Sequence, residues 1–293
     1  MKDYTGQLFG GSWTEKKLEI LKKYFKSYNT VLKKQPFNRV YVDGFAGTGY
    51  RQQSKHQYDI QGIFEDLEQD ESQQFLKGSA KLALEAIPSF HRYIFIESDQ
   101  SKIDELEKLK NEHSEKAEQI EIIRGDANEF IQIYCNDENW ANTRAVLFLD
   151  PFATEVEWKS LEAVAKTKCI DVWILFPLMA VNRLLAKDHK KVCYGCLNRL
   201  FGTQDWFEHF YETQTLDNIF GQSIDTIDKA CDFTRIGNFY KNRLGTIFSG
   251  VAEQPKVFYN SRGSALFQLF FAAGNAKGAP IAIRIAEHLM RNI

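Results

Sequence analysis

The chain has 293 residues, of which 44% are hydrophobic and 14% aromatic, so it can bury a substantial core and is not expected to be disordered as a whole. The net charge of −2 hides a segregation along the chain, because residues 1–40 carry nine Lys and Arg against three Asp and Glu, whereas residues 50–80 carry three against six. No apolar run approaches the roughly 20 residues that a membrane span needs, and the first residues lack the apolar core of a signal peptide. We therefore expect a cytoplasmic protein with no membrane contact.

The first predicted element is a basic amphipathic helix. Ser12 and Glu15 have the spacing of a capping box, so a helix should begin there, and Pro36 closes the segment. Apolar side chains recur every three or four residues, at Leu18, Leu21, Phe25, Tyr28 and Leu32, with seven lysines among them. Such lysines form either a solvated face or part of a nucleic-acid surface. We interpret residues 1–38 as an N-terminal basic helical segment that packs on the core.

Short β-branched or aromatic runs then alternate with helical patterns. The expected strands are Arg39–Val42, Arg92–Ile96, Ile120–Arg124, Ala145–Leu149 and Ile170–Phe176. The expected helices are Ser79–Ile87, Gln100–Asn111, Asn128–Cys135 and Glu155–Lys166. Near-continuous apolar strands between amphipathic helices predict a mostly parallel, doubly wound α/β sheet. Because ligands bind outside the carboxyl ends of the strands in such a sheet, the residues that follow each strand are the candidates for a site.

Two segments depart from this alternation. Residues 50–78 form a polar, acidic insertion without clear periodicity, which we expect to be a mobile loop. Past Pro177 we expect a helical insertion at about 178–244, with helices at Val181–Lys187, Leu197–Phe201, Gln204–Thr213 and Thr226–Leu244. An antiparallel hairpin, Lys256–Tyr259 with Ala265–Ala272, and a last helix opened by Pro280 follow. The main domain is therefore expected to span residues 39–293.

Cysteine usage favours free thiols. The sequence has five cysteines, an odd number, scattered through apolar or mixed segments, which suits a reducing compartment better than a disulfide scaffold. Cys193 and Cys196 form a Cys-x-x-Cys pair with His189 four residues before it, which superficially suggests zinc. A structural zinc needs four ligands, and no second pair with metal spacing follows. We therefore interpret the pair as coincidental and expect no metal site.

The first strand runs into a glycine-rich loop, Asp43-Gly44-Phe45-Ala46-Gly47-Thr48-Gly49. Glycine permits positive φ and a close backbone approach, and the Gly-x-Gly core is typical of nucleotide-binding turns. It is not a Walker A loop, since no Lys-Ser/Thr follows the last glycine. The loop alone predicts either a cofactor cradle or a tight structural turn.

Acids follow the next two strands. Glu97 ends the second strand and is placed to accept both hydroxyls of an adenosine ribose. The polar insertion separates it from the glycine loop, so the usual interval of about 20 residues is not kept. A solvated strand-end carboxylate is the alternative. Asp126 follows the third strand and could take an adenine amino group, with the Ala127 amide facing the ring, or it merely caps the following helix.

The fourth strand ends in Asp150-Pro151-Phe152, and an aspartate that leaves an apolar strand before a proline is poorly explained by packing. These three residues are the candidates for catalysis, with a turn-forming Asp-Pro as the alternative. Asn182 and Arg183 come just after the fifth strand and are candidates for binding a substrate phosphate or carboxylate, or they make a helix-start contact instead.

Together, the four strand ends resemble the class I S-adenosyl-L-methionine (SAM)-dependent methyltransferases, in the order glycine loop, acid, Gly-Asp and Asp-Pro. A dehydrogenase loop should run Gly-x-Gly-x-x-Gly, whereas the glycines here are spaced G-x-x-G-x-G. The resemblance implies a Rossmann-like class I methyltransferase fold with SAM as the cofactor. It implies these contacts: Asp43, Gly44, Gly47 and Gly49 around the methionine part, Glu97 on the ribose, Asp126 on adenine, and Asp150 with Phe152 toward the acceptor.

Several segments are more narrowly similar to the bacterial three-Cys-motif partner (TcmP) family. They are Trp-Thr-Glu-Lys-Lys-Leu-Glu-Ile-Leu-Lys-Lys-Tyr, Tyr-Val-Asp-Gly-Phe-Ala-Gly-Thr-Gly, the Gly78-Ser79 helix start, Phe-Ile-Glu-Ser-Asp, Gly-Asp-Ala-Asn, Leu-Asp-Pro-Phe-Ala, Ile-Asp-Val-Trp-Ile-Leu-Phe-Pro and Asn182-Arg183-Leu184-Leu185. The resemblance covers nearly the whole chain. It implies a methyltransferase-like protein that is often encoded beside a radical-SAM-type protein carrying the three cysteines, which is a candidate partner.

The resemblance to methyltransferases implies nucleophilic attack on a sulfonium methyl group, so the protein must position the acceptor in line and exclude water. On a base amino group, Asp150 could accept a hydrogen bond while Phe152 stacks on the ring. The motif departs from the Asp-Pro-Pro-Tyr of amino-directed DNA methyltransferases by lacking the second proline and the tyrosine. Five bases between Arg183 and Arg199 and the basic first helix favour nucleic acid as acceptor and partner. The alternatives are a non-catalytic partner protein in a bacterial defence or mobile-element operon and a nucleic-acid-binding protein without catalysis.

Overall fold

The computed structural model describes residues 12–46, 78–151, 153–217, 223–260 and 262–293. Within these residues, an eight-stranded sheet has the order β3-β2-β1-β4-β5-β10-β8, and β9 pairs with β10 outside that path. The strands are β1 (Asn38–Asp43), β2 (Arg92–Glu97), β3 (Ile120–Arg124), β4 (Thr143–Leu149), β5 (Ile170–Phe176), β8 (Gly250–Val251), β9 (Lys256–Tyr259) and β10 (Ala265–Ala273).

The sheet is mostly parallel. β1 pairs in parallel with both β2 and β4, β2 pairs with β3, and β4 pairs with β5. β10 is antiparallel to β5, β8 and β9, so the expected hairpin of β9 and β10 is present. The order of the first five strands reverses between β1 and β4, which is where doubly wound sheets bind ligands. The predicted Rossmann-like, mostly parallel doubly wound sheet, with its antiparallel C-terminal hairpin and added helices, is confirmed.

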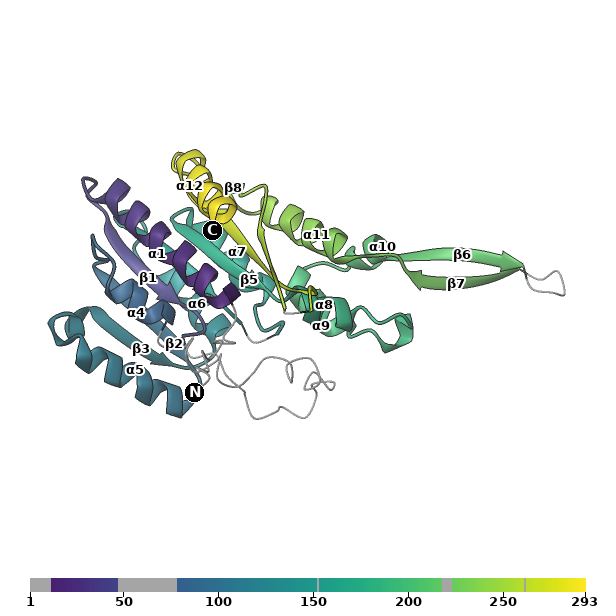
Figure 1. Ribbon diagram of the computed structural model, residues 1–293, viewed down its shortest axis with the longest axis horizontal. Coiled ribbons are helices and arrows are strands. Elements are labelled where there is room, and N and C mark those ends of the chain that lie inside the picture. Colours follow the sequence, from purple (N-terminus) through teal and green to yellow (C-terminus); the bar gives the residue numbers. More distant parts are fainter. Residues whose placement is uncertain (1–11, 47–77, 152, 218–222, 261) are drawn as a thin grey trace, which may run out of the picture.

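Helices cover both faces of this sheet, as Figure 1 shows. The helices on one face are α1 (Ser12–Leu32), α4 (Gly78–Leu84), α5 (Gln100–Glu112) and α12 (Ala279–Asn292). Those on the other are α6 (Ala127–Asp137), α7 (Trp158–Thr167), α8 (Leu178–Leu184), α9 (Tyr194–Phe201), α10 (Trp206–Phe210) and α11 (Phe233–Gly245). Two short 3₁₀ turns, η1 (Ser114–Gln119) and η2 (His189–Lys191), complete the helical elements of the described residues. Strand side chains alternate between the faces, so Val40 and Val42 pack beneath α6 and α7 whereas Tyr41 packs beneath α1.

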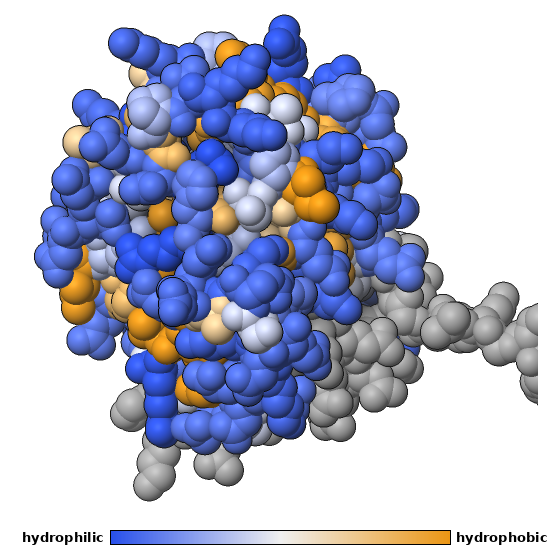
Figure 2. All heavy atoms as spheres, turned by 90° about the vertical axis from the view of Figure 1, so that its left-hand side faces the viewer, coloured by the Kyte–Doolittle hydropathy of each residue, from blue (hydrophilic) through white to orange (hydrophobic). Residues whose placement is uncertain are grey.

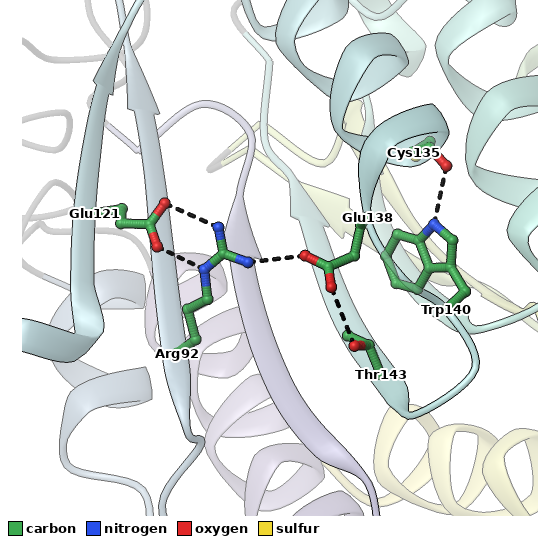
Figure 3. A network of polar contacts seen from close by, with 6 residues as sticks. All are labelled: Arg92, Glu121, Cys135, Glu138, Trp140 and Thr143. Atoms are coloured by element: carbon green, nitrogen blue, oxygen red, sulfur yellow. Dashed lines mark hydrogen bonds and ion pairs between the residues drawn. The ribbon is translucent and has the colours of Figure 1, made fainter.

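A polar network ties the amino ends of three strands together (Figure 3). Arg92 at the start of β2 donates from Nε and Nη2 to the two carboxylate oxygens of Glu121 on β3, at 2.6 and 3.0 Å. Its Nη1 donates to Glu138, at 2.8 Å, and Glu138 accepts a further bond from the hydroxyl of Thr143, the first residue of β4. Because bidentate Arg–carboxylate pairs fix geometry as well as charge, this network holds the edge of the sheet in register.

The segment expected to be a helical insertion at 178–244 contains a hairpin, so this prediction is wrong in part. The helices expected at Gln204–Thr213 and Thr226–Leu244 are replaced in part by strands β6 (Tyr211–Asp217) and β7 (Ser223–Lys229), which pair antiparallel and project from the body as an arm (Figure 1). β-Branched side chains such as Thr213 and Ile227 favour the extended backbone. Of the predicted polar insertion at 50–78, only Gly78, which opens α4, lies within the described residues.

Cys193 and Cys196 are joined by a disulfide, so the expectation of free thiols is wrong for this pair. Cys193 is the N-cap of α9 and Cys196 lies in its first turn, where a spacing of three brings their Cα atoms to 5.4 Å, within the range that a disulfide needs. Cys135, Cys169 and Cys231 are free. Along the described part of the chain, no helix is both long and apolar enough to cross a membrane.

Candidate functional site

Asp43 ends β1 at the carboxyl edge of the sheet and is almost completely buried, with 1% of its surface exposed. Its Oδ2 accepts hydrogen bonds from the Tyr41 hydroxyl at 3.0 Å and from the Ser79 hydroxyl on α4 at 2.7 Å. Its Oδ1 accepts no well-aligned hydrogen bond from a described residue, although the Phe45 backbone amide is close enough to lower the pKa of this carboxyl group. Burial raises the pKa of Asp43 to about 6. A buried carboxylate oxygen without a well-aligned donor is an incomplete interaction, and a ligand can complete it.

The loop after Asp43 connects three strand ends. The Gly44 amide donates to the carbonyl of Phe148 on β4 at 2.9 Å, and the Ala46 amide donates to the carbonyl of Ile96 on β2 at 2.9 Å. A Cβ on Gly44 would lie 2.7 Å from a methyl carbon of Leu149, so the Leu149 side chain would have to shift to admit any other residue here. Phe45 is partly buried against the core. The predicted cofactor contacts Gly47 and Gly49 lie outside the described residues.

Glu97 ends β2, next to β1, and its side chain is fixed by its own loop. Its Oε1 accepts from the backbone amides of Ser98 and Asp99, at 2.6 and 2.7 Å. With 8% of its surface exposed, Glu97 is not the solvated strand-end acid that was one alternative. The sequence did not indicate that Lys102 on α5 would be buried. Its ammonium group is enclosed and has no hydrogen-bond partner in the described part of the chain. Burial lowers the pKa of Lys102, and the charge of Glu97 opposes that shift.

Asp126 lies after β3 and caps α6, which is the structural alternative considered for it. Its Oδ1 accepts from the amides of Asn128 and Glu129, at 2.8 and 3.2 Å. Ala127 is the buried first residue of the helix. The Gly125 amide donates to the carbonyl of Glu97 at 3.0 Å, so the β3 turn lies against the end of β2. The structure therefore brings the third predicted strand end to the same edge, and adenine contact by Asp126 stays a prediction.

Asp150 directly follows β4 and forms an ion pair with Lys17 of α1, at 2.9 Å. Both side chains are buried, with 1% of Lys17 and 7% of Asp150 exposed. The Lys17 ammonium also lies 5.0 Å from the ring centroid of Trp13, within the range of a cation–π contact. Burial raises the pKa of Asp150, and the Lys17 charge opposes this shift. Pro151 is buried beside it, and Phe152 lies outside the described residues.

Lys17 was not among the predicted site residues, because all the lysines of α1 were expected on a solvated or nucleic-acid-binding face. The helical spacing contains the signal: Lys17 precedes Leu21 by four residues and Tyr24 by seven, so it shares the buried face of α1. Its charge is retained there because Asp150 neutralises it.

Asn182 on α8 is hydrogen-bonded to the base of the arm. The Lys229 ammonium at the base of β7 donates to both the backbone carbonyl and the side-chain oxygen of Asn182, at 2.7 and 2.8 Å. Asn182 therefore anchors the arm to α8. Arg183 is exposed on the same helix. Substrate binding by these two residues stays a prediction.

The ends of β1, β2 and β4 thus form one site with a buried Asp43, a buried Glu97 and the Lys17–Asp150 ion pair. The charge of Asp150 contributes to the raised pKa of Asp43, because the two carboxylates lie near each other in the buried region. Three carboxylates and a glycine loop at adjoining strand ends can receive a ligand that carries cationic and hydroxyl groups.

No protein-family model matches the sequence, and no curated protein sequence matches it significantly. Among solved structures, the chain is similar to a protein from Legionella pneumophila at 11% identity and a TM-score of 0.47, over 92% of this chain and 90% of that chain. It is also similar to a provisionally assigned methyltransferase from Escherichia coli (10% identity, TM-score 0.32, 86% and 87% covered) and to a dimethyladenosine transferase from Plasmodium falciparum (13% identity, TM-score 0.30, 76% and 66% covered). Because these three TM-scores are below 0.5, we draw no conclusion about activity from these likenesses, and the sheet topology itself establishes the fold.

Proposed function

We propose that the chain is a SAM-dependent methyltransferase-like protein that binds SAM at the carboxyl ends of β1 and β2. The observation that carries this proposal is the pair of buried carboxylates, Asp43 and Glu97, on both sides of the Gly44 loop at the reversal point of the sheet. The resemblance to TcmP makes that family the narrower assignment. It favours a cytoplasmic bacterial protein with a radical-SAM-type partner.

The residues fit the groups of SAM. The Oδ1 of Asp43, which lacks a well-aligned donor, suits the ammonium group of the methionine part. The hydrogen bonds that Glu97 accepts within the described residues all reach Oε1, which leaves Oε2 to accept ribose hydroxyls. The turn that carries Asp126 and Ala127 lies against the end of β2, which supports adenine as their partner in this proposal. When bound, SAM supplies an electrophilic methyl group.

Asp150, Pro151 and the following Phe152 are the proposed residues on the acceptor side. The Lys17 charge favours the ionised form of Asp150, which could then accept a hydrogen bond from an amino group of the acceptor. Nucleic acid is the favoured acceptor because six lysines of α1 and its end are exposed: Lys16, Lys22, Lys23, Lys26, Lys33 and Lys34.

The Lys17–Asp150 ion pair also supports a second candidate, a non-catalytic partner protein that keeps the fold and the cofactor site. A carboxylate already neutralised by a buried lysine has less capacity to orient an acceptor. The two candidates differ in turnover. With methyl-labelled SAM, label transferred to nucleic acid, protein or small molecules supports the enzyme, and binding without transfer supports the partner protein. Salt-sensitive nucleic-acid binding that survives Asp150→Ala without any methyl transfer supports the nucleic-acid-binding alternative.

Titration calorimetry with SAM and S-adenosylhomocysteine tests the cofactor site. We expect Glu97→Gln to weaken binding about ten- to a hundred-fold, because a hydrogen bond to a charged group contributes about 1.5–3 kcal/mol. Glu129→Gln is the matched control, since Glu129 is exposed on α6. Absence of SAM binding by the wild type, or equal binding by the folded Glu97→Gln variant, would overturn the proposal.

A further inference from the structure

A second cavity lies at the opposite edge of the sheet from the proposed cofactor site. It has a volume of about 350 Å³ and is lined by α1, by the first half of α12 and by the amino ends of β4 and β5. Asp171 and Arg144, the second residues of β5 and β4, lie in its wall. The face seen in Figure 2 is mostly hydrophilic, with apolar side chains in separate patches. The exposed Val31 and Ile281 belong to the lining, so the cavity opens between apolar side chains.

A tyrosine hydroxyl in this cavity lacks a partner. Tyr28 is more than nine-tenths buried, and its hydroxyl forms no hydrogen bond with any described residue. Buried hydroxyl groups in proteins are nearly always paired, because an unpaired one loses its water without compensation. The cavity therefore presents a polar atom that a bound molecule can satisfy.

The wall also contains a carboxylate without an ion pair. Asp171 accepts from the Tyr24 hydroxyl at 2.9 Å and from the Gly274 amide at 3.3 Å. No cationic nitrogen of the described residues lies within 4.0 Å of this carboxylate. Burial raises the pKa of Asp171 to about 6, so at neutral pH the group is an anion that the protein compensates incompletely.

Arg144 makes its hydrogen bonds to backbone carbonyls, although its charge also acts on Tyr28 and Asp171. The Nη1 of Arg144 donates to the carbonyls of Trp140 and Thr143, at 3.0 and 2.6 Å, and its guanidinium stacks 4.0 Å from the centroid of Phe37. Its charge lowers the pKa of Asp171 only in part. Lys277 is exposed at the rim. The inner wall therefore combines the Asp171 carboxylate, two tyrosine rings and an aliphatic surface with the Arg144 guanidinium, which is held by two backbone carbonyls and the Phe37 ring.

We propose that this cavity binds a small organic amine, whose ammonium group lies beside Asp171 and Tyr28 and whose apolar body packs between α1 and α12. The ammonium ion donates to the carboxylate and to the Tyr28 hydroxyl, and the rings of Tyr24 and Tyr28 add cation–π attraction. The aliphatic side chains of Leu32 and Ile285 contact the hydrocarbon part. The volume suits a small ligand, since ligand pockets begin at about 300 Å³. This site is independent of the cofactor edge and of the proposed methyltransferase function.

Calorimetry with three molecules that share a 2-phenylethyl group and differ in the charge of the polar end tests the proposal: 2-phenylethylamine, 2-phenylethanol and 3-phenylpropanoate. We expect the wild type to bind the amine at least tenfold more tightly than the alcohol or the acid. Asp171→Asn should reduce amine affinity tenfold or more, and Tyr28→Phe should reduce it severalfold. Tyr240→Phe is the matched control, because Tyr240 is also buried with an unpartnered hydroxyl but lies on the other face of the sheet.

Folding of each variant is checked by its thermal unfolding midpoint. If Asp171→Asn does not fold, Ala282→Trp fills the cavity without removing a polar group and should abolish amine binding. The proposal is overturned if the wild type binds no amine, if it binds the acid as tightly as the amine, or if Tyr28→Phe and Ala282→Trp both bind the amine like the wild type.

Discussion

Replacing Lys17 with methionine leaves the Asp150 carboxylate buried without its ion-pair partner. The nitrogen and oxygen are 2.9 Å apart, and 1% and 7% of the two side chains are exposed, so water cannot replace the lost charge. Removal of one partner from such a buried pair costs about 3–5 kcal/mol. With an unfolding entropy of about 2.1 cal/mol/K per residue, a chain of 293 residues should lose roughly 5–8 °C in Tm. Methionine keeps the length and apolar stem of lysine, so the loss reports the charge.

Urea unfolding followed by far-UV circular dichroism measures this loss. Lys22→Met on the same helix is the control, because Lys22 is exposed and its replacement should change stability by less than about 0.5 kcal/mol. In the double variant Lys17→Met/Asp150→Asn neither charge remains, and we expect a coupling energy of about 2 kcal/mol or more. The reasoning is refuted if Lys17→Met is no more destabilising than Lys22→Met, or if the two substitutions are additive.

Three further predictions concern other parts of the fold. Arg92→Met removes the cation between two glutamates and should cost about 1–2 kcal/mol of unfolding free energy, since the guanidinium is partly exposed. High salt should reduce that cost, and a loss of stability that does not depend on salt would contradict the prediction. Gly202→Ala should reduce the unfolding free energy by about 3 kcal/mol, because φ is +64° and the new Cβ would lie 2.0 Å from Trp158. Gly263→Ala, at φ +78°, places its Cβ where no atom lies within 4 Å, so the cost should be about 1 kcal/mol. Equal losses of stability in urea unfolding would be inconsistent with this difference. Burial raises the pKa of Asp171 from 3.8 to about 6, so the folded state binds the proton of this carboxyl more tightly than the unfolded state does. As the pH rises from 4 to 7, the wild type should therefore lose up to about 3 kcal/mol of unfolding free energy relative to Asp171→Asn. A difference in stability that stays constant over this pH range would contradict the prediction.

The central sheet was predictable because each strand is an apolar run bounded by turns. Ile120–Arg124 and Ile170–Phe176 have the bounds that the sequence predicts, and the hairpin of β9 and β10 is where the pattern placed it. Buried parallel strands leave this signal because both of their faces must be apolar. The positions of Asp43, Glu97, Asp126 and Asp150 at one edge followed from the same alternation.

What the sequence did not predict depends on contacts between distant segments. Lys17 looks like its exposed neighbours until β4 brings Asp150 beside it. The sequences of β6 and β7 are mostly polar, so no apolar period distinguishes this segment from a helix or a loop. Asn182 could not be recognised as an anchor, because Lys229 lies far along the chain. Side-chain chemistry identified candidates, and only the packing showed which groups were already paired.

The position of α1 has a consequence for how the chain folds during its synthesis. Tyr24 on this helix packs against Phe271 on β10, roughly 250 residues later, and α1 also contacts α12. At about 5–20 residues per second, ribosomal synthesis takes roughly 12–50 s to cover that distance. During this interval the aromatic face of α1 has no β10 or α12 to pack against. The nascent chain therefore carries an exposed aromatic surface on the ribosome, and it is during this period that we expect it to depend on chaperones.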